Sequence, residues 1–495
     1  MKKNLNKIFL TFALIGVSIA NVGCSDDDIY LEDPGNVVYQ DYYNTEAEFR
    51  AAVEGMYQSF FSAGYFAGAD NSSDIISMGE IMADNVILNP AGRQAGFSAH
   101  VWNFASSAPS SIYESSYMMI ARANAILDNI DNLDVYNIPN VKAEIRAHAL
   151  VVRALAHFEI SRWYLKIPTQ SSDANSFVGI AYVEQFDPLG EFLPSREATV
   201  ADVYAKVLSD MEEAIPSLPA TATPGQISQK AANGLMSRIQ LYNGNYPAVI
   251  AYAESVVAST PVTLATEIQG YWRCQNSIGV LIERPVATNS DPTIGVSYSQ
   301  GNGPDLKTEY TVDKAFYDLF ESTETARRNA FIGYHAAKNI YYVNKYVQSA
   351  FGLGRSHGRY LRIEEVILNL AEAQYLNGDP GAALITLNKL RDNRYTSYAG
   401  GETGDALFAA IQLERRKELA FESDRFFTLK RLQNVPNIPS SFKQGVVRSG
   451  NGHLADGTGV PSSILTLTPS EREWQFPLSL LQLQSNPNMT QTPGY

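Results

Sequence analysis

The sequence predicts an all-α protein built from helix pairs, with long loop excursions and little β structure. Three observations favour this class. Apolar residues recur at helical spacing over several long stretches. Two of these stretches repeat the same helix–turn–helix pattern. The segments between the helices are long, rich in Gly, Pro, Ser and Asn, and too aromatic for simple linkers; they cover residues 61–75, 88–110, 166–198, 258–310 and 434–470.

The N-terminus has the features of a secretory signal peptide. Residues 1–7 carry three lysines and no acid, and residues 8–20 are almost entirely apolar. As a helix this apolar run would span about 20 Å, which is too short for a bilayer core of about 30 Å. We therefore predict a signal peptide over residues 1–23; the alternative is a buried core helix.

One cysteine and a run of acids follow the apolar segment, in the stretch NVGCSDDD (21–28). Gly23-Cys24 resembles the bacterial lipoprotein box, in which the cysteine becomes the first mature residue and its thiol takes a lipid. Asn21 stands where that box usually has a leucine-like residue. The next residues form either a solvated acidic linker or a surface-export signal like that of some Gram-negative lipoproteins; they are Ser25, Asp26, Asp27 and Asp28. We expect lipidation at Cys24 and an acidic lead-in over residues 24–43.

The helices begin after this lead-in. Residues 44–60 start with a cap-like Asn44 or Thr45 and carry apolar residues at helical spacing. Residues 112–130 and 141–165 repeat the pattern, and residues 199–218 start with a capping pair, Thr199 and Asp202. We expect one helical domain over residues 44–495.

Two later stretches resemble each other. Asn243-Gly244-Asn245 matches Asn377-Gly378-Asp379, and Ala248 matches Ala382. A glycine that ends one helix, before a small residue in the next, resembles a tetratricopeptide unit. Such units are clearest at residues 227–257 and 361–393.

Composition excludes several classes of protein. The chain has a net charge of −14 and no basic stripe, which argues against binding nucleic acid. With Cys24 lipidated only Cys274 remains, so no internal disulfide is expected. The histidines lack the spacing of a zinc helix, and no nucleophile elbow or phosphate loop is present. Glu414 and Glu418 are better explained as a solvated helix face or a structural salt bridge than as catalytic carboxylates. We expect no enzyme activity, no cofactor and no metal.

Five motifs in order, behind the lipoprotein box, resemble the SusD/RagB family of outer-membrane nutrient-binding lipoproteins. The helix at 141–165 carries an Arg-Ala pair followed by Tyr and Pro, and the other motifs lie at 361–378, 387–394, 411–431 and 476–495. The matching residues are Arg153-Ala154, Tyr164, Pro168, Arg362, Glu365, Ala371-Glu372-Ala373, Glu414-Arg415, Glu418-Leu419, Phe421-Glu422, Arg425, Phe476-Pro477, Asn486-Pro487, Gln491 and Pro493-Gly494-Tyr495. Leu165-Lys166 and Thr428 depart from the family pattern.

The resemblance implies a cell-surface lipoprotein, held to the outer membrane by its lipid anchor only, that binds oligosaccharide and delivers it to a TonB-dependent, SusC-like transporter. Two alternatives stay open. One is capture of peptide or glycopeptide for the same kind of transporter, and the other is a helical-repeat scaffold that binds a protein.

Ligand residues are expected on loops, as aromatic rings for sugar faces and polar groups for hydroxyls. The stretch 88–104 offers Arg93 and Trp102, and Asp84 lies just before it. The stretch 271–298 offers Tyr271, Trp272 and Tyr298. For the two tryptophans a core position is the alternative, as it is expected for Trp163 and Trp474. Trp102 and Trp272 exposed in one concavity would favour a sugar ligand.

Overall fold

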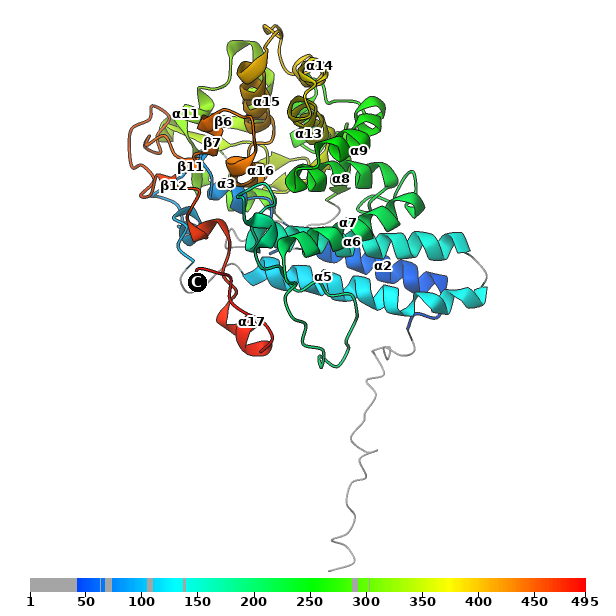
Figure 1. Ribbon diagram of the computed structural model, residues 1–495. Coiled ribbons are helices and arrows are strands. Elements are labelled where there is room, and N and C mark those ends of the chain that lie inside the picture. The colour runs from blue at the N-terminus through cyan, green and yellow to red at the C-terminus, as the bar shows by residue number, and fades with distance from the viewer. Residues whose placement is uncertain are drawn as a thin grey trace, which may run out of the picture. The chain divides into compact units, whose positions relative to one another are not determined.

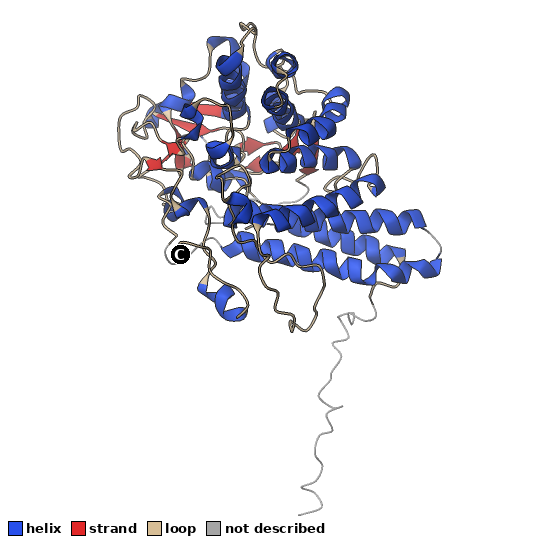
Figure 2. Ribbon diagram, viewed as in Figure 1, coloured by secondary structure: helices blue, strands red, loops and turns tan. Residues whose placement is uncertain are grey.

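The chain was analysed as a computed structural model. It describes residues 42–62, 64–66, 74–104, 110–136, 139–286, 293–301 and 303–495. The predicted signal peptide, Cys24 and the acidic residues 25–28 lie outside these ranges. Helices dominate and the strands are short, which confirms the predicted class (Figure 2).

Four long helices pack together as one bundle (Figure 1). They are α2 (Glu46–Phe60), α5 (Ser110–Asn129), α6 (Pro139–Tyr164) and α7 (Val200–Ala214). Helix α6 packs against the other three and is almost entirely buried over residues 145–165. Trp163, near its end, is buried against Phe427 and Phe476, so the predicted core position is confirmed.

Local sequence fixes where two of these helices begin. At α2 the Thr45 hydroxyl accepts from the Glu48 backbone N–H, and the Glu48 carboxylate accepts from the Thr45 backbone N–H. Thr199 and Asp202 make the same reciprocal pair at α7. Each pair satisfies two backbone donors that the first helical turn would otherwise leave free. Both predicted helix starts are therefore confirmed.

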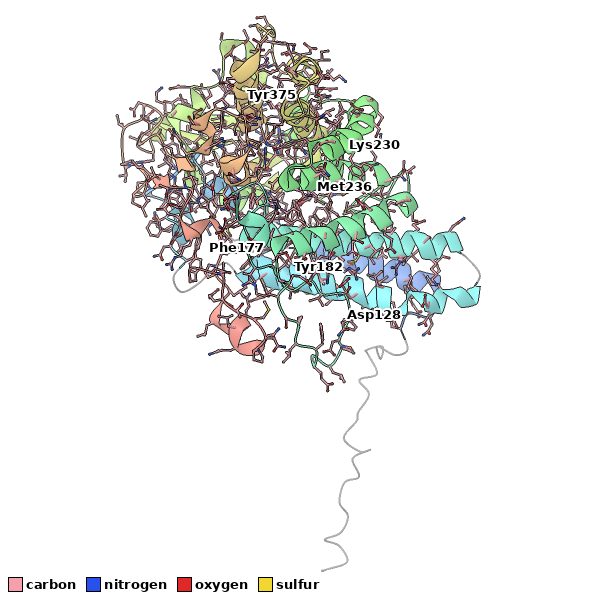
Figure 3. All side chains as sticks on the ribbon, in the orientation of Figure 1. Asp128, Phe177, Tyr182, Lys230, Met236 and Tyr375 are labelled. Carbon is pink, nitrogen blue, oxygen red and sulfur yellow. The ribbon has the colours of Figure 1, made fainter. Side chains whose placement is uncertain are left out.

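The repeated pattern folds as two helix pairs. Helix α8 (Gln229–Asn243) is followed by α9 (Tyr246–Ser259), and α13 (Ile363–Leu376) by α14 (Pro380–Arg391). Gly244 and Gly378 have φ of 76° and 88°, a left-handed conformation that glycine adopts without strain. The two pairs are in contact, because α13 packs on both α8 and α9. Met236 of α8 and Tyr375 of α13 mark the two pairs in Figure 3.

The remaining helices are mostly short and connect these groups. They are α3 (Met78–Ile81), α4 (Phe97–His100), α10 (Ile268–Trp272), α11 (Lys314–Tyr317), α12 (Thr325–Phe331), α15 (Gly404–Glu418), α16 (Asp424–Arg431) and α17 (Leu480–Ser485).

Short antiparallel strands lie in two of the predicted loop regions, 258–310 and 434–470, and in residues 332–362. A four-stranded sheet has the order β1–β5–β7–β6, and the other sheets of the described residues have two strands each. In the four-stranded sheet Val86 pairs with Val312, and Tyr334 pairs with Tyr341. The strands are β1 (Val86–Leu88), β2 (Val280–Arg284), β3 (Ser299–Gln300), β4 (Lys307–Thr308), β5 (Tyr310–Val312), β6 (Ile332–His335), β7 (Ile340–Val343), β8 (Gln348–Ser349), β9 (Gly352–Leu353), β10 (Gly358–Arg362), β11 (Val446–Val447) and β12 (Thr466–Leu467).

The carboxylates of α15 form buried ion pairs in the protein core. Glu418 lies between Arg362 and Arg394, with side-chain N–O distances of 2.8 and 2.9 Å, and Arg327 reaches Glu414 at 2.8 Å. Burial disfavours the charge on Glu418, but Arg394 and Arg362 overcome it and hold the pKa of that carboxyl well below its usual range. Of the two interpretations for this helix row, the structural salt bridge is correct, although the pairs are buried rather than solvated.

Candidate functional site

Trp102 is buried, so it does not lie on the surface as a ligand platform. Its side chain is 5% exposed, and its indole N–H donates to the Met82 carbonyl oxygen at 3.1 Å. The Arg448 guanidinium lies 4.2 Å from the ring centroid. A ring enclosed in this way has no face free for a sugar.

The aromatic candidates around residue 271 are also core residues. The Trp272 ring packs edge-to-face against Phe331 and Tyr346, and Tyr298 stacks on Tyr346. Tyr271, Trp272 and Tyr298 are each at most 2% exposed. Helix α10 carries Tyr271 and Trp272. Because this helix packs on α12, both rings point into the protein. The two tryptophans therefore do not form the exposed pair that would have favoured sugar, and the structure gives these three residues a packing role.

Asp84 is buried in an ion-pair cluster. Its carboxylate accepts two hydrogen bonds from Arg425, at 2.7 and 2.8 Å, and lies 3.2 Å from Arg416. Burial opposes the charge, but Arg416 and Arg425 outweigh it and lower the pKa of Asp84 well below its usual range. These bonds join the segment before β1 to helices α15 and α16. Asp84 is thus satisfied within the protein and is not free for a ligand.

Arg93 is the sequence candidate that the structure leaves at the surface. Its side chain is 43% exposed, and its Nε donates to Glu309 at 2.7 Å. The backbone N–H of Arg93 donates to the same carboxylate, at 2.7 Å. Phe97, four residues further on, is 45% exposed. Glu309 therefore fixes the 88–98 loop while leaving these two side chains accessible.

A group of three tyrosines at the β6–β7 hairpin, one exposed and two partly buried, was missed in the sequence. Tyr334 and Tyr341 face each other across the hairpin, and Tyr317 of α11 stacks on Tyr341. The Tyr317 and Tyr341 ring centroids are 3.9 Å apart and Tyr334 is 55% exposed. On the other side of the hairpin the Tyr342 ring covers Gly333, where a Cβ atom would lie 2.1 Å from it. The alternation in IYYV could have indicated a strand, but not which ring faces water.

Hydrogen bonds connect the loops whose surface carries these side chains. His335 Nε2 lies 2.9 Å from the Gly303 carbonyl oxygen. The Lys338 ammonium donates to the Leu306 carbonyl oxygen. Asn339 donates to the Asp456 carboxylate at 2.9 Å. Gly303 and Leu306 lie between the paired strands β3 and β4. Glu309, which accepts hydrogen bonds from Arg93, directly follows β4. We call this surface the loop face and define it by Arg93, Phe97, Tyr317, Tyr334, Tyr341 and Asp456; its strands lie on one side of Figure 1.

The chemistry of the loop face suits binding. Burial, with Tyr317 alongside, raises the pKa of Tyr341 to about 12, so its phenol is neutral at physiological pH. The face combines aromatic rings with the polar groups of Arg93, His335, Lys338 and Asp456. Among the described residues no group of three His, Cys, Asp or Glu side chains could hold a metal ion. Flat rings and hydrogen-bonding groups match a ligand with both apolar C–H faces and hydroxyls.

Two family models match the chain. Residues 39–241 match the model described as "starch-binding associating with outer membrane", and residues 274–495 match that of the SusD family. The chain belongs to the SusD/RagB family. The motifs in the last third of the sequence thus indicated the correct family.

Relatives of the SusD family cover most of the chain. SusD-like protein P2 from Formosa agariphila is 23% identical, over 87% of this chain and 91% of its own length. The fold is similar to that of a SusD-like carbohydrate-binding protein from Bacteroides vulgatus, with a TM-score of 0.74, 17% identity and coverage of 90% and 97%. It is also similar to surface glycan-binding protein A from Bacteroides uniformis, with a TM-score of 0.71, 18% identity and coverage of 90% and 99%.

Within the described part of this SusD-family chain, no helix is long and apolar enough to cross a membrane.

Proposed function

We propose that this protein is a lipid-anchored protein of the outer-membrane surface that binds oligosaccharide on its loop face and delivers it to a TonB-dependent, SusC-like transporter. The observation that carries the proposal is the packed group of Tyr317, Tyr334 and Tyr341, with Tyr334 exposed, in a chain of the SusD family. A related solved structure is a glycan-binding protein by its description, which supports the same ligand class.

The loop face has the parts that sugar capture needs. A pyranose has an apolar C–H face that packs on an aromatic ring. Its hydroxyls can accept hydrogen bonds from Arg93 and can donate them to the Asp456 carboxylate. The rings are held by packing and by the hairpin, so little conformational entropy is lost when a ligand stacks on them. Binding of a neutral glycan does not require a strong net charge on the loop face.

The test is a calorimetric titration of the full chain with a panel of oligosaccharides. The chain is kept in a detergent without a sugar headgroup, because such a headgroup would compete for the site. We expect saturable binding of at least one glycan and a loss of at least about tenfold in affinity for Tyr334→Ala. Tyr252→Ala is the matched control, because Tyr252 lies on α9, away from the loop face. Unchanged glycan affinity in Tyr334→Ala would contradict the proposed site.

A peptide is the alternative ligand to compare with oligosaccharide. Strand β6 lies at the edge of its sheet in the described residues, so an extended peptide could pair with it. Short neutral and basic peptides are therefore titrated in parallel. Binding of peptides but not of glycans would replace the ligand class while keeping the family.

The anchor and the partner need separate measurements. Mass spectrometry of the N-terminal peptide from cells would show a lipid on Cys24, and Cys24→Ala would abolish it. Replacing Asp26, Asp27 and Asp28 with Asn would remove protease accessibility on intact cells if these acids are an export signal. Co-purification of a TonB-dependent transporter with the full chain would test the partner.

A further inference from the structure

A hollow lies among the long helices, away from the elements of the loop face. It is bounded by α2, α6 and the connection between α7 and α8, and its volume is about 300 Å³. A water molecule takes up about 30 Å³ in the liquid, so this space holds roughly ten waters. That is the lower end of the range for small-molecule sites, which fits a ligand the size of one sugar ring.

The floor of the hollow contains a neutral, buried histidine. His148 is 2% exposed, and its Nδ1 lies 2.9 Å from the Tyr57 hydroxyl oxygen. Burial lowers the pKa of His148 to about 4, so the ring carries no charge at neutral pH. In the described part of the chain its other nitrogen, Nε2, has no hydrogen-bond partner. Val53 and Ile145 beside it supply an apolar surface.

The lining of the hollow holds one pair of opposite charges, Arg50 and Glu144, and Glu46 outside the lining also pairs with Arg50. Arg50 donates to Glu46 at 2.7 Å and to Glu144 at 3.0 Å. One guanidinium between two carboxylates leaves no free cation for an anionic ligand. The outer oxygens and N–H groups of such a pair can still bind hydroxyls, which act as both donors and acceptors.

The remaining wall, residues 219–226, adds free polar groups. Among the described residues the side chains of Thr221, Thr223 and Gln226 make no hydrogen bond, although all three line the hollow. Pro219 and Ala222 lie between them and are apolar. The lining thus mixes apolar patches with uncharged donors and acceptors.

We infer that this hollow is a second binding site, for a neutral polyol the size of a monosaccharide. An anionic ligand would find no unpaired cation, and a purely apolar one would leave His148, the two threonines and Gln226 without partners. A sugar ring satisfies both kinds of surface. The inference does not depend on the loop face, because the two sites share no element.

The test uses the full chain and D-glucose, D-galactose and D-mannose as probes, one at a time. The readouts are titration calorimetry and the NMR signals of the histidine rings, in a detergent without a sugar headgroup. We expect saturable binding of at least one probe and a concentration-dependent shift of the His148 ring protons. Gln226→Ala should weaken binding about tenfold, and Ala222→Phe, which fills the space without removing a polar group, should abolish it.

Controls separate this hollow from the loop face. Gln269→Ala removes an exposed glutamine on α10. This variant should bind the monosaccharides with the affinity of the unaltered chain. Tyr334→Ala should leave monosaccharide binding at the hollow intact. The inference is overturned if none of the three sugars shifts His148, if Ala222→Phe binds normally, or if the binding disappears with Tyr334→Ala alone.

Discussion

The rings of Tyr317 and Tyr341 stack face to face, with centroids 3.9 Å apart and planes 10° apart. One ring comes from the end of helix α11 and the other from strand β7, and the Arg328 guanidinium lies 5.2 Å from the Tyr317 ring centroid. The stack is part of the loop face, so each ring supports the other at the site where we propose that glycan binds.

The stacked tyrosines should act as a coupled pair. In a double-mutant cycle with Tyr317→Ala and Tyr341→Ala, we expect a coupling free energy of about 0.5–1.5 kcal/mol in the free energy of unfolding. Urea denaturation of the four proteins measures it. Additive effects of the two substitutions would show that the stack contributes nothing beyond burial.

Trp102 and Trp272 should behave as core residues. Replacing either with Ala should lower the free energy of unfolding by about 3–5 kcal/mol, because each leaves a large cavity. Phe97→Ala, at an exposed ring near Trp102, should change it by less than about 1 kcal/mol. Urea denaturation compares the three variants. If a tryptophan variant keeps normal stability, the burial described above is incorrect for that residue.

Asp84 should make stability depend on acid pH. Its pKa is lowered in the folded protein, so its contribution is fully present above the unfolded pKa of about 3.9 and is lost as pH falls toward the folded value. Asp84→Asn should lower the free energy of unfolding at pH 7 by about 3–5 kcal/mol, because two arginines lose their buried anion. It should also flatten the decline of stability between pH 5 and 3.

A surface pair gives the control for Asp84. Arg146 and Glu213 form an exposed ion pair, so Glu213→Gln should change stability by at most about 1 kcal/mol. A loss as large as that of Asp84→Asn would mean that burial does not distinguish the two pairs.

Glu80 should change the pH dependence of stability in the direction opposite to Asp84. Burial raises the pKa of its carboxyl to about 7, even though Asn85 donates to it at 2.6 Å. The folded protein therefore binds one more proton than the unfolded chain between about pH 4.3 and 7, and stability falls as pH rises through this window. Glu80→Gln should remove that fall, which is on the order of 3 kcal/mol. Thermal denaturation from pH 4.5 to 8 measures it, and an unchanged slope would contradict the assignment.

The helical class, the helix starts at Thr45 and Thr199, the glycine turns at Gly244 and Gly378, and the family could all be predicted from the sequence. These features are local: a cap joins residues three apart, and a helix face repeats every few residues. The burial of Trp163 and Trp474 also followed from their places on a helix and in the tail motif.

Which of the candidate side chains reach water depends on the packing of distant segments against one another. Asp84 is bound by Arg425, 341 residues away along the chain, and Trp102 is covered by Arg448. Tyr334, in contrast, is 55% exposed, while Tyr342 on the opposite face of the same hairpin packs over Gly333. The exposure of these loop and hairpin side chains is set by contacts between segments far apart in sequence, which residue type and spacing do not specify.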